Sequence, residues 1–189
     1  MAEADPRRRR ADARRNETAL LAAAADVFVE AGVDAPVRTI AARAGVGVAT
    51  IYRHFPSRAD LVVGVYRHQV EECADAAPEL LASSATPYDA LVAWIDRFVD
   101  FLVTKHGLAA ALRSDEAAFD TLHAWFLARL VPACQSLLEA STAGGQTGQD
   151  VSAYELMRGV GNLCIGADQD EQYDARRLVA LLLAGLRRP

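Results

Sequence analysis

The sequence is poor in cysteine, in strand-like segments and in long hydrophobic runs. Its three cysteines, Cys73, Cys134 and Cys164, are widely spaced in apolar helical patterns, which favours packing roles in a reducing compartment over disulfides. No apolar run approaches the roughly 20 residues that a bilayer-spanning helix needs. The polar, Arg-rich segment 1–16 is followed by no apolar stretch of the kind found in signal peptides. We therefore expect a cytoplasmic protein with no membrane association.

Catalytic and metal-binding patterns are also scarce. Because strand signals are nearly absent, no Gly-rich phosphate loop follows a strand. His68 with Glu71 or Glu72 is a single pair on one helical face, which is too few ligands for a metal site. The histidines as a set show no repeated ligand spacing: His54, His68, His106 and His123. No Ser/His/Asp constellation stands out, so we expect no enzyme, no metal site and no cofactor.

Hydrophobic residues are plentiful, and the charges are divided unevenly along the chain. With 52% hydrophobic residues, a chain of 189 residues can bury one core and a small additional module, and wholesale disorder is excluded. Segment 1–68 holds eleven basic and eight acidic residues, whereas segment 69–189 holds nine basic and seventeen acidic residues. A basic end on an acidic body fits a protein that contacts a polyanion at one end only.

Helical periodicity predicts an all-α fold of about nine helices. Apolar residues recur with helical spacing in segments 14–31, 37–44, 48–54, 57–73, 88–105, 108–113, 116–140, 152–167 and 174–187. We expect a kink or a division at Pro132. Segment 78–87, with two Pro, two Ser and a Thr, is expected to be a connector, and segment 141–149, with three Gly, a flexible loop.

The two short helices are the most informative feature. Small Ala residues in segment 40–46 allow two helices to approach closely, and Gly45 supplies the tight turn between them. Ile40, Val46 and Ile51 are predicted to form a small core. This pattern is typical of a helix-turn-helix, in which the second helix lies in the major groove of DNA. That helix is predicted to turn Phe55 inward and to expose groups that reach phosphates and base edges: Ala49, Thr50, Arg53 and His54.

The motif resembles a known family. Val37 to Val46 (VRTIAARAGV) followed by Thr50 to Leu61 (TIYRHFPSRADL) is similar to the DNA-binding signature of the tetracycline-repressor (TetR) family over about residues 14–62. The ending 181–186 resembles that family's last helix. The resemblance implies a flexible Arg-rich arm at 1–13, a helix-turn-helix domain at 14–60 with its motif at about 36–55, and a ligand-binding and dimerisation domain at 61–189.

The resemblance also implies which residues contact DNA. Arg58 stands where the family usually has Lys, at a helix start that also attracts phosphate. Pro36, Gly47 and Val48 depart from the polar residues that are common at their positions, so a thymine-methyl contact becomes plausible for Val48 or Ala49. The implied DNA-binding residues are Arg38, Thr39, Val48, Ala49, Thr50, Tyr52, Arg53, His54 and Arg58.

The Arg-rich arm is open to two interpretations. Arg7 to Arg10, with Arg14 and Arg15, could be a disordered solubilising tail. The same residues could instead add electrostatic attraction to DNA or enter an adjacent minor groove.

The C-terminal segment is expected to bind an effector and to dimerise. Its aromatic residues are either plain core or the lining of a pocket for a small apolar or aromatic molecule. Candidate ligand-binding residues are Trp94, Phe98, Phe101, Phe119, His123, Phe126, Met157 and Asn162. The last two helices are expected to pair with those of a second copy. Candidate interface residues are Leu156, Val160, Leu163, Cys164, Leu178, Leu181, Leu182 and Gly185.

These expectations define one function and two alternatives. The favoured function is a homodimeric transcriptional regulator, a repressor released from a palindromic double-stranded operator by its effector. The first alternative is a helical carrier protein whose N-terminal module no longer binds DNA, given Pro36, Gly47 and Val48. The second is an all-helical enzyme, for which the sequence shows no convergent set of acid, base or metal ligands.

Overall fold

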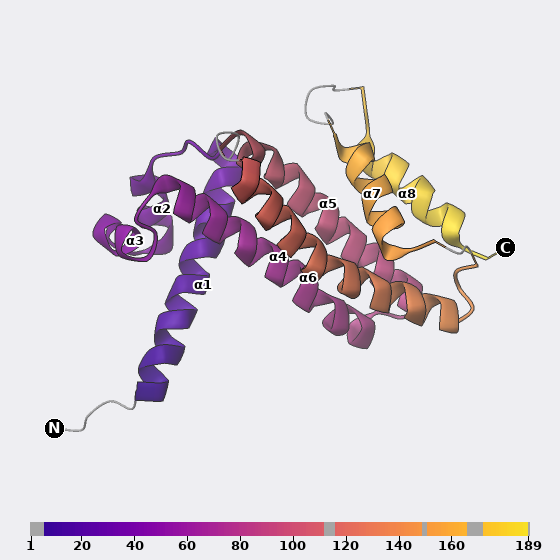
Figure 1. Ribbon diagram of the computed structural model, residues 1–189. Helices are drawn as coiled ribbons and strands as arrows, with labels where there is room; N and C mark the ends of the chain where they lie inside the picture. Colours follow the sequence, from indigo (N-terminus) through magenta and orange to yellow (C-terminus); the bar gives the residue numbers. More distant parts are fainter. Residues whose placement is uncertain (1–5, 112–115, 149–150, 166–171, 189) are drawn as a thin grey trace. The chain divides into compact units, whose positions relative to one another are not determined.

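The computed structural model describes residues 6–111, 116–148, 151–165 and 172–188, and within these ranges it is helical (Figure 1). Side chains are described over 15–102, 120–148, 151–165 and 172–188. The described residues contain eight helices, one fewer than predicted, and no strand. The helices are α1 (Pro6–Ala31), α2 (Val37–Ala44), α3 (Val48–His54), α4 (Arg58–Ser83), α5 (Pro87–Ala111), α6 (Glu116–Ala143), α7 (Ala153–Cys164) and α8 (Ala175–Leu186).

The helices fall into two compact units. The N-terminal unit holds residues 1–69 and 107–115, and the C-terminal unit holds residues 70–106 and 116–189. The division lies between Gln69 and Val70, inside α4. The functional boundary expected between residues 60 and 61 stays a prediction, because compactness does not test it.

In the N-terminal unit, α2 and α3 have the predicted bounds. Gly45 ends α2 in the left-handed conformation, with φ 66°, and its N–H points to the carbonyls of Ala41 and Ala42. Val46 N then donates to Ala41 O at 3.0 Å. A left-handed residue is cheapest as glycine, since it has no Cβ to clash with the backbone. The turn between the two helices therefore follows from one residue.

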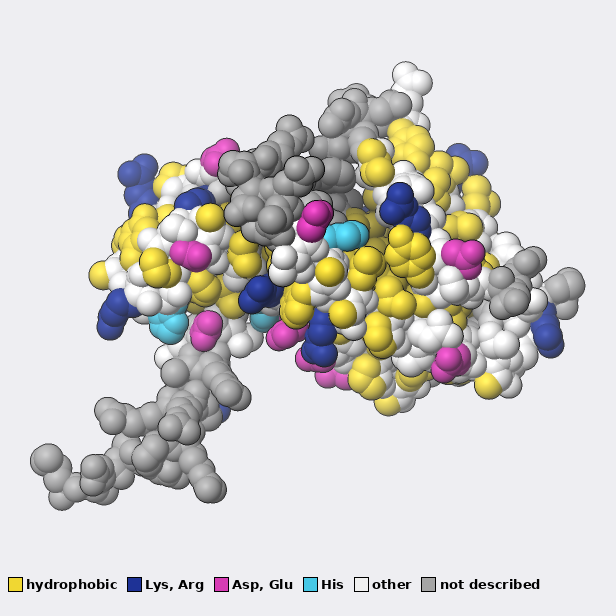
Figure 2. Space-filling view, in the orientation of Figure 1, with side chains coloured by type: hydrophobic (Ala, Val, Ile, Leu, Met, Phe, Trp, Pro, Cys, Tyr) yellow, Lys and Arg dark blue, Asp and Glu magenta, His cyan; other side chains and the backbone are white. Residues whose placement is uncertain are grey.

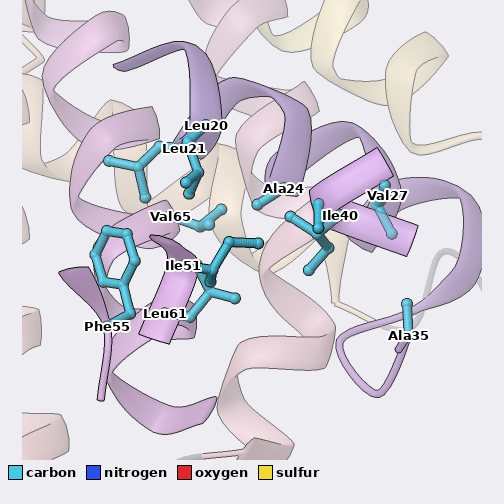
Figure 3. Packing of buried hydrophobic residues seen from close by; sticks show 11 residues of the cluster. Leu20, Leu21, Ala24, Val27, Ala35, Ile40, Ile51, Phe55, Leu61 and Val65 are labelled. Carbon is cyan, nitrogen blue, oxygen red and sulfur yellow. The ribbon is translucent and has the colours of Figure 1, made fainter. Parts of the chain in front are cut away.

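A small apolar core holds these short helices. Figure 3 shows side chains from several N-terminal helices converging in one place. Ile40 from α2 and Ile51 from α3 are 0% and 1% exposed, and Leu61 from α4 is 2% exposed. The predicted contribution of Ile40, Val46 and Ile51 to one core is confirmed, with Val46 partly buried at its edge. A seven-residue helix is unstable alone, so this packing is what fixes α3.

Several predicted helix ends were wrong because packing outweighed local signals. α4 continues through Pro78 to Ser83, where we expected a connector, and Ala76 and Ala77 beside that proline are buried. α6 is one helix through Pro132, so it is not divided there, and the kink expected as the alternative stays a prediction; Leu130 and Cys134 around it are 0% exposed. A proline inside a helix costs one hydrogen bond and a steric clash. Buried apolar side chains offset that cost: they precede Pro78 in α4 and lie on both sides of Pro132 in α6.

Other boundaries moved for local reasons. α1 begins at Pro6 rather than near Arg14, since proline is favoured in the first helical turn and Arg and Ala are good helix formers. α5 runs from Pro87 to Ala111, so most of the short helix expected at 108–113 belongs to it, and residues 112–113 lie outside the described residues. α7 ends at Cys164, and segment 166–167 of its expected range is likewise outside them.

The C-terminal unit is organised around an aromatic cluster. Trp94 stacks on Phe98 with ring centroids 5.7 Å apart, and Phe101 stacks on Phe126 at 5.6 Å. The indole Nε1 of Trp94 donates to the Cys73 carbonyl at 2.7 Å, which satisfies the buried polar atom. Stacked aromatic pairs of this kind add to the free energy of burial, so this cluster is part of the core that stabilises the unit.

Two backbone hydrogen bonds hold the end of α8 and the residues that follow it against the segment that follows α6, in the same unit. Gly148 N donates to Leu186 O at 3.1 Å, and Arg188 N donates to Gln146 O at 2.9 Å. The amide Oε1 of Gln146 accepts from Tyr88 N at the start of α5. The segment expected to be a flexible loop thus connects the end of α8 to α5. None of the helices, over the residues described, is long and apolar enough to cross a bilayer.

Candidate nucleic-acid interface

The recognition surface is the outer side of α3. Ile51 and Phe55, one helical turn apart, face the core and are 1% and 8% exposed. Val48 and Tyr52, also one turn apart, are 39% and 48% exposed. Large apolar or aromatic side chains at the surface of so short a helix are available for contact with a partner.

Polar side chains complete this surface. Arg53 and His54 are exposed in the last turn of α3, where the helix dipole favours positive charge. The Arg53 Nη2 donates to Thr50 Oγ1 at 3.1 Å, so both side chains are directed along the exposed side. Ala49 is exposed, and Thr50 is half-buried. In Figure 2, basic side chains lie at the surface of the part of the molecule that holds α2 and α3. The predicted outward orientation of the α3 polar residues is therefore observed.

The start of α2 adds a second polar edge. Pro36 precedes the helix and gives no side-chain cap, and Thr39 N bonds to Pro36 O at 2.9 Å. Arg38 and Thr39 are exposed in the first turn. Because the first N–H groups of a helix are unsatisfied and carry partial positive charge, this end can accept a phosphate.

Arg43 of α2 is engaged within the protein. Its guanidinium holds Glu30 of α1 in a bidentate pair, with the Nη2 to Oε2 distance 2.6 Å. The hydrogen bond and then the charge of Arg43 lower the pKa of Glu30, and the same pair raises the pKa of Arg43. The charge of Arg43 is thus balanced by Glu30, and the pair joins α1 to α2.

Arg58 departs from the expected orientation. It was expected to meet phosphate at the start of α4, but its Nη2 donates to the Val33 carbonyl. Its guanidinium carbon lies 5.3 Å from the centre of the Phe28 ring. The side chain is half-buried and turned toward the end of α1. Sequence alone missed this, because the partner is a backbone atom 25 residues away.

The candidate effector residues do not share one environment. Trp94, Phe98, Phe101, Phe126 and Met157 are buried. His123 is half-buried and stacks on Phe126 with centroids 5.6 Å apart, whereas Asn162 is exposed on α7. The side chain of Phe119 lies outside the described residues. The structure thus brings the aromatic candidates and His123 together and places Asn162 at the surface.

The candidate dimer residues are also divided. On α7, Leu156, Val160 and Cys164 are buried within the chain itself, which packs α7 against α6 and α8. Leu181 is 60% exposed, Gly185 is exposed, and three are half-buried: Leu163, Leu178 and Leu182. Sequence reasoning missed Tyr154 and Ile165, which are 47% and 71% exposed. Helical periodicity found the apolar side of α7 that the chain covers, and these two residues lie outside it.

Over the described residues, the metal-ligand groups and the cysteine thiols lack what a metal site or a nucleophile needs. This part of the chain contains no group of three or more His, Cys, Asp or Glu side chains that could hold a metal ion. Burial raises the pKa of the Cys73 and Cys134 thiols to about 12. Thiols held protonated in this way are poor nucleophiles.

An all-helical chain with an exposed helix-turn-helix held on a small core is a DNA-binding regulator by class. Comparison with known proteins identifies the family of regulators to which it belongs. Residues 20–65 match the bacterial regulatory proteins of the tetR family, and residues 86–188 match the C-terminal domain of SbtR-like transcriptional regulators. The chain belongs to the TetR family of transcriptional regulators, a family of regulatory proteins rather than enzymes.

Individual relatives agree with this assignment. The crystal structure of the TetR transcriptional regulator SCO0520 from Streptomyces coelicolor is 36% identical, covers 90% of this chain and 98% of its own, and has a TM-score of 0.79. A TetR regulatory protein from Mycobacterium vanbaalenii is 31% identical, covers 95% and 99%, and has a TM-score of 0.73. The HTH-type transcriptional activator FasR of Mycolicibacterium smegmatis is 34% identical over 92 residues, which span 48% of this chain and 41% of FasR.

Proposed function

We propose that this protein is a homodimeric repressor that binds a palindromic DNA operator and is released by a small apolar or aromatic effector. The observation that supports it most directly is the outer surface of α3, with Tyr52 and Val48 exposed and Arg53 and His54 beside them. The proposed DNA contacts are these four residues with Ala49 and Thr50 on α3 and Arg38 and Thr39 on α2. A cytoplasmic location follows from a DNA partner.

The exposed apolar side chains of α7, of its C-cap residue and of α8 support the dimer. Tyr154, Ile165 and Leu181 are among the most exposed large hydrophobic residues of the described chain. Figure 2 shows hydrophobic side chains at the surface where α7 and α8 lie. A second copy related by a two-fold axis would cover this surface with the same residues, as closed homodimers do. Leu178, Leu182 and Gly185 of α8, which are not fully buried, extend the proposed interface.

A dimer explains how so small a motif can select DNA. Two copies of α3 would enter successive major grooves about one helical turn apart, so the operator would be a palindrome. Val48 and Ala49 offer apolar contact to a thymine methyl, and Arg53 can bond to a guanine edge. Each phosphate neutralised by a basic side chain adds roughly 0.9 to the slope of log affinity against log salt.

The aromatic cluster supports an apolar effector. Phe98, Phe101 and Phe126 stack on one another, and the half-buried His123 adds a polar edge at Phe126. A molecule that binds among such side chains would shift the conformation only if it binds the DNA-free state more tightly. We propose that the protein represses transcription. Because its relative FasR is an activator by name, activation of transcription is the alternative.

The test begins with selection of an operator. Purified full-length protein should enrich a palindromic sequence from random duplexes, and Tyr52→Ala should lose binding to it by about 100-fold in a gel-shift assay while remaining dimeric. The loss follows if the ring and hydroxyl together contribute about 1.4 kcal/mol in each of the two half-sites, because each 1.4 kcal/mol is a factor of ten in affinity. Val29→Ala, at a residue 61% exposed on α1, is the matched control and should bind normally.

Three results would contradict the proposal. Enrichment of no sequence would remove specific DNA binding, and unchanged affinity of Tyr52→Ala would remove the α3 surface from the interface. A reporter gene under the selected operator decides the output: transcription should rise when the regulator gene is deleted, and a fall would mean activation.

A further inference from the structure

Arg58 joins three parts of the N-terminal unit. It is the first residue of α4, and its Nη2 donates to the Val33 carbonyl in the turn between α1 and α2. Its guanidinium carbon lies 5.3 Å from the centre of the Phe28 ring on α1. The Nε atom is buried and has no hydrogen-bond partner in the described structure. A planar cation that is stacked, bonded and half-buried is held in one orientation.

Electrostatics favours this inward orientation. The positive end of α4's dipole lies at its first turn, so a cation there gains from moving to a site of negative potential. The turn after α1 offers such a site, because the Val33 carbonyl oxygen carries partial negative charge and lies just beyond the negative end of the α1 dipole. Arg58 reaches it by bonding to the Val33 carbonyl. The side chain thus points away from the positive end of the α4 dipole and toward a carbonyl oxygen just beyond the negative end of the α1 dipole.

The start of α4 is already occupied by a carboxylate. Asp60 Oδ2 accepts from Ser57 N at 3.0 Å and from Ser57 Oγ at 2.7 Å, and Ser57 Oγ accepts from Asp60 N at 3.1 Å. A phosphate at this helix end would meet the negative charge of Asp60 at close range. The position is therefore poor for DNA backbone contact in the conformation observed.

The turn that Arg58 holds leads directly to the DNA-contacting start of α2. Ala35 N donates to Gly32 O at 3.1 Å, and Ala35 is 4% exposed. Thr39 N donates to Pro36 O at 2.9 Å. A short bonded segment therefore connects Val33 to Thr39, so a shift of Val33 would be transmitted to the first turn of α2.

We propose that Arg58 is a positioning residue for DNA binding and not a phosphate ligand: by fixing the α1–α2 turn it sets where Arg38 and Thr39 meet the DNA backbone. The proposal rests on the DNA-binding function proposed above. It adds an assignment for Arg58 that differs from the one its position in the motif implies.

The experiment compares Arg58→Ala with Arg38→Ala in the full-length dimer. Dissociation constants are measured for the selected operator and for a scrambled duplex over a range of salt concentrations. Arg58→Ala should weaken operator binding about tenfold, the size expected if misplacing Arg38 costs about one charge-assisted hydrogen bond to phosphate. Because phosphate contacts do not depend on sequence, its affinity for scrambled DNA should fall by a similar factor. Added to Arg38→Ala, Arg58→Ala should lower the affinity less than it does alone and should leave the salt slope unchanged. Arg38→Ala should lower the slope by about 0.9 for each phosphate lost.

Each alternative has a distinct signature. A salt slope that falls by about a further 0.9 per phosphate when Arg58→Ala is added to Arg38→Ala would make Arg58 a phosphate ligand and overturn the proposal. A loss of helical circular dichroism in Arg58→Ala that is large enough to account for the weaker binding would indicate only a smaller folded fraction, which also overturns it. Phe28→Leu, which removes the ring and keeps the charge, should weaken operator binding in the same way. The double variant should be no weaker than the more affected single variant, and additive losses would mean that the two residues act separately.

A DNA-free measurement separates this proposal from the proposed function. Hydrogen exchange of the Ala35 and Thr39 amides should accelerate in Arg58→Ala, because the turn is less constrained. Unchanged exchange would overturn the positioning role whatever DNA the protein binds. Failure of the wild type to select an operator would instead count against the proposed function.

Discussion

The short helix α3 of the N-terminal unit exposes its largest aromatic side chain to solvent, whereas the long helix α5 of the C-terminal unit buries its own. Tyr52 on α3 is 48% exposed, and Trp94 on α5 is 0% exposed. In the first unit a small core needs only to hold a surface in place. In the second, the aromatic cluster is itself both the core and the proposed effector site, so function and stability there depend on the same residues.

This difference predicts where a substitution is most damaging to the fold. Trp94→Ala removes a buried indole, its stack on Phe98 and its hydrogen bond to Cys73 O, and should cost about 3 to 5 kcal/mol of unfolding free energy. Urea denaturation followed by circular dichroism measures the loss. Trp94→Phe keeps the stack and should cost about 1 to 2 kcal/mol, the share of the hydrogen bond.

The comparison would fail if Trp94→Ala were as damaging to the N-terminal unit as to its own. Amide exchange should therefore accelerate in α5 and α6 well before it accelerates in α2 and α3. Uniform acceleration in both units would show that they unfold together and that the contrast between them has no energetic meaning.

The next prediction addresses close packing in the N-terminal unit. A Cβ on Gly64 of α4 would lie 2.7 Å from Cε1 of Phe55 and 3.3 Å from Cδ2 of Leu21. Gly64→Ala gains about 1 kcal/mol of helix propensity but should lose about 2 to 3 kcal/mol through overpacking, since Phe55 must move. The net loss of about 1 to 2 kcal/mol should come with weaker operator binding, because Phe55 ends α3.

Gly161 of α7, in the C-terminal unit, is the matched control. A Cβ there would meet nothing within 4 Å, so Gly161→Ala should stabilise the protein by up to about 1 kcal/mol. If both alanine variants changed stability in the same direction, the close contact at Gly64 would not be what limits that position.

The same contrast explains what could be predicted from sequence. The bounds of α2 and α3 were correct, because Gly45 and Pro56 are local signals that act on their own neighbours. Pro78 and Pro132 are equally strong local signals, yet α4 and α6 continue through them. A long helix with buried side chains next to a proline gains more from packing than it loses at one hydrogen bond.

The candidate site followed the same rule. The outward side of α3 could be predicted because helical spacing separates Ile51 and Phe55 from Val48 and Tyr52. The inward orientation of Arg58 could not, because it depends on a backbone carbonyl brought close by folding. Periodicity also marked the apolar side of α7 without showing that the chain covers that side itself.

A smaller effect is expected at the cap of α7. Ser152 Oγ accepts from Glu155 N at 3.2 Å, and Glu155 Oε2 accepts from Ser152 N at 3.0 Å, so each side chain satisfies the other's backbone. Ser152→Ala should cost about 1 kcal/mol of unfolding free energy. Ser152→Asp restores an acceptor and should recover most of it in the same denaturation assay. A loss as large as that of Trp94→Ala would mean that the C-terminal unit depends on its helix ends as much as on its core.

The smallest effect is expected at the exposed pair between α1 and α2. Arg43 lowers the pKa of Glu30 below its usual 4.5, first by its hydrogen bonds and then by its charge. A carboxyl whose pKa is lowered by folding contributes stability above its unfolded pKa, and this is lost as the pH falls through its folded pKa. Glu30→Gln should therefore be slightly less stable than the wild type at pH 7, and the difference should vanish as the pH falls through the folded pKa of Glu30, with urea midpoints as the measure. A difference that persists at low pH would show that the pair acts through packing, and the N-terminal unit would then resemble the C-terminal one.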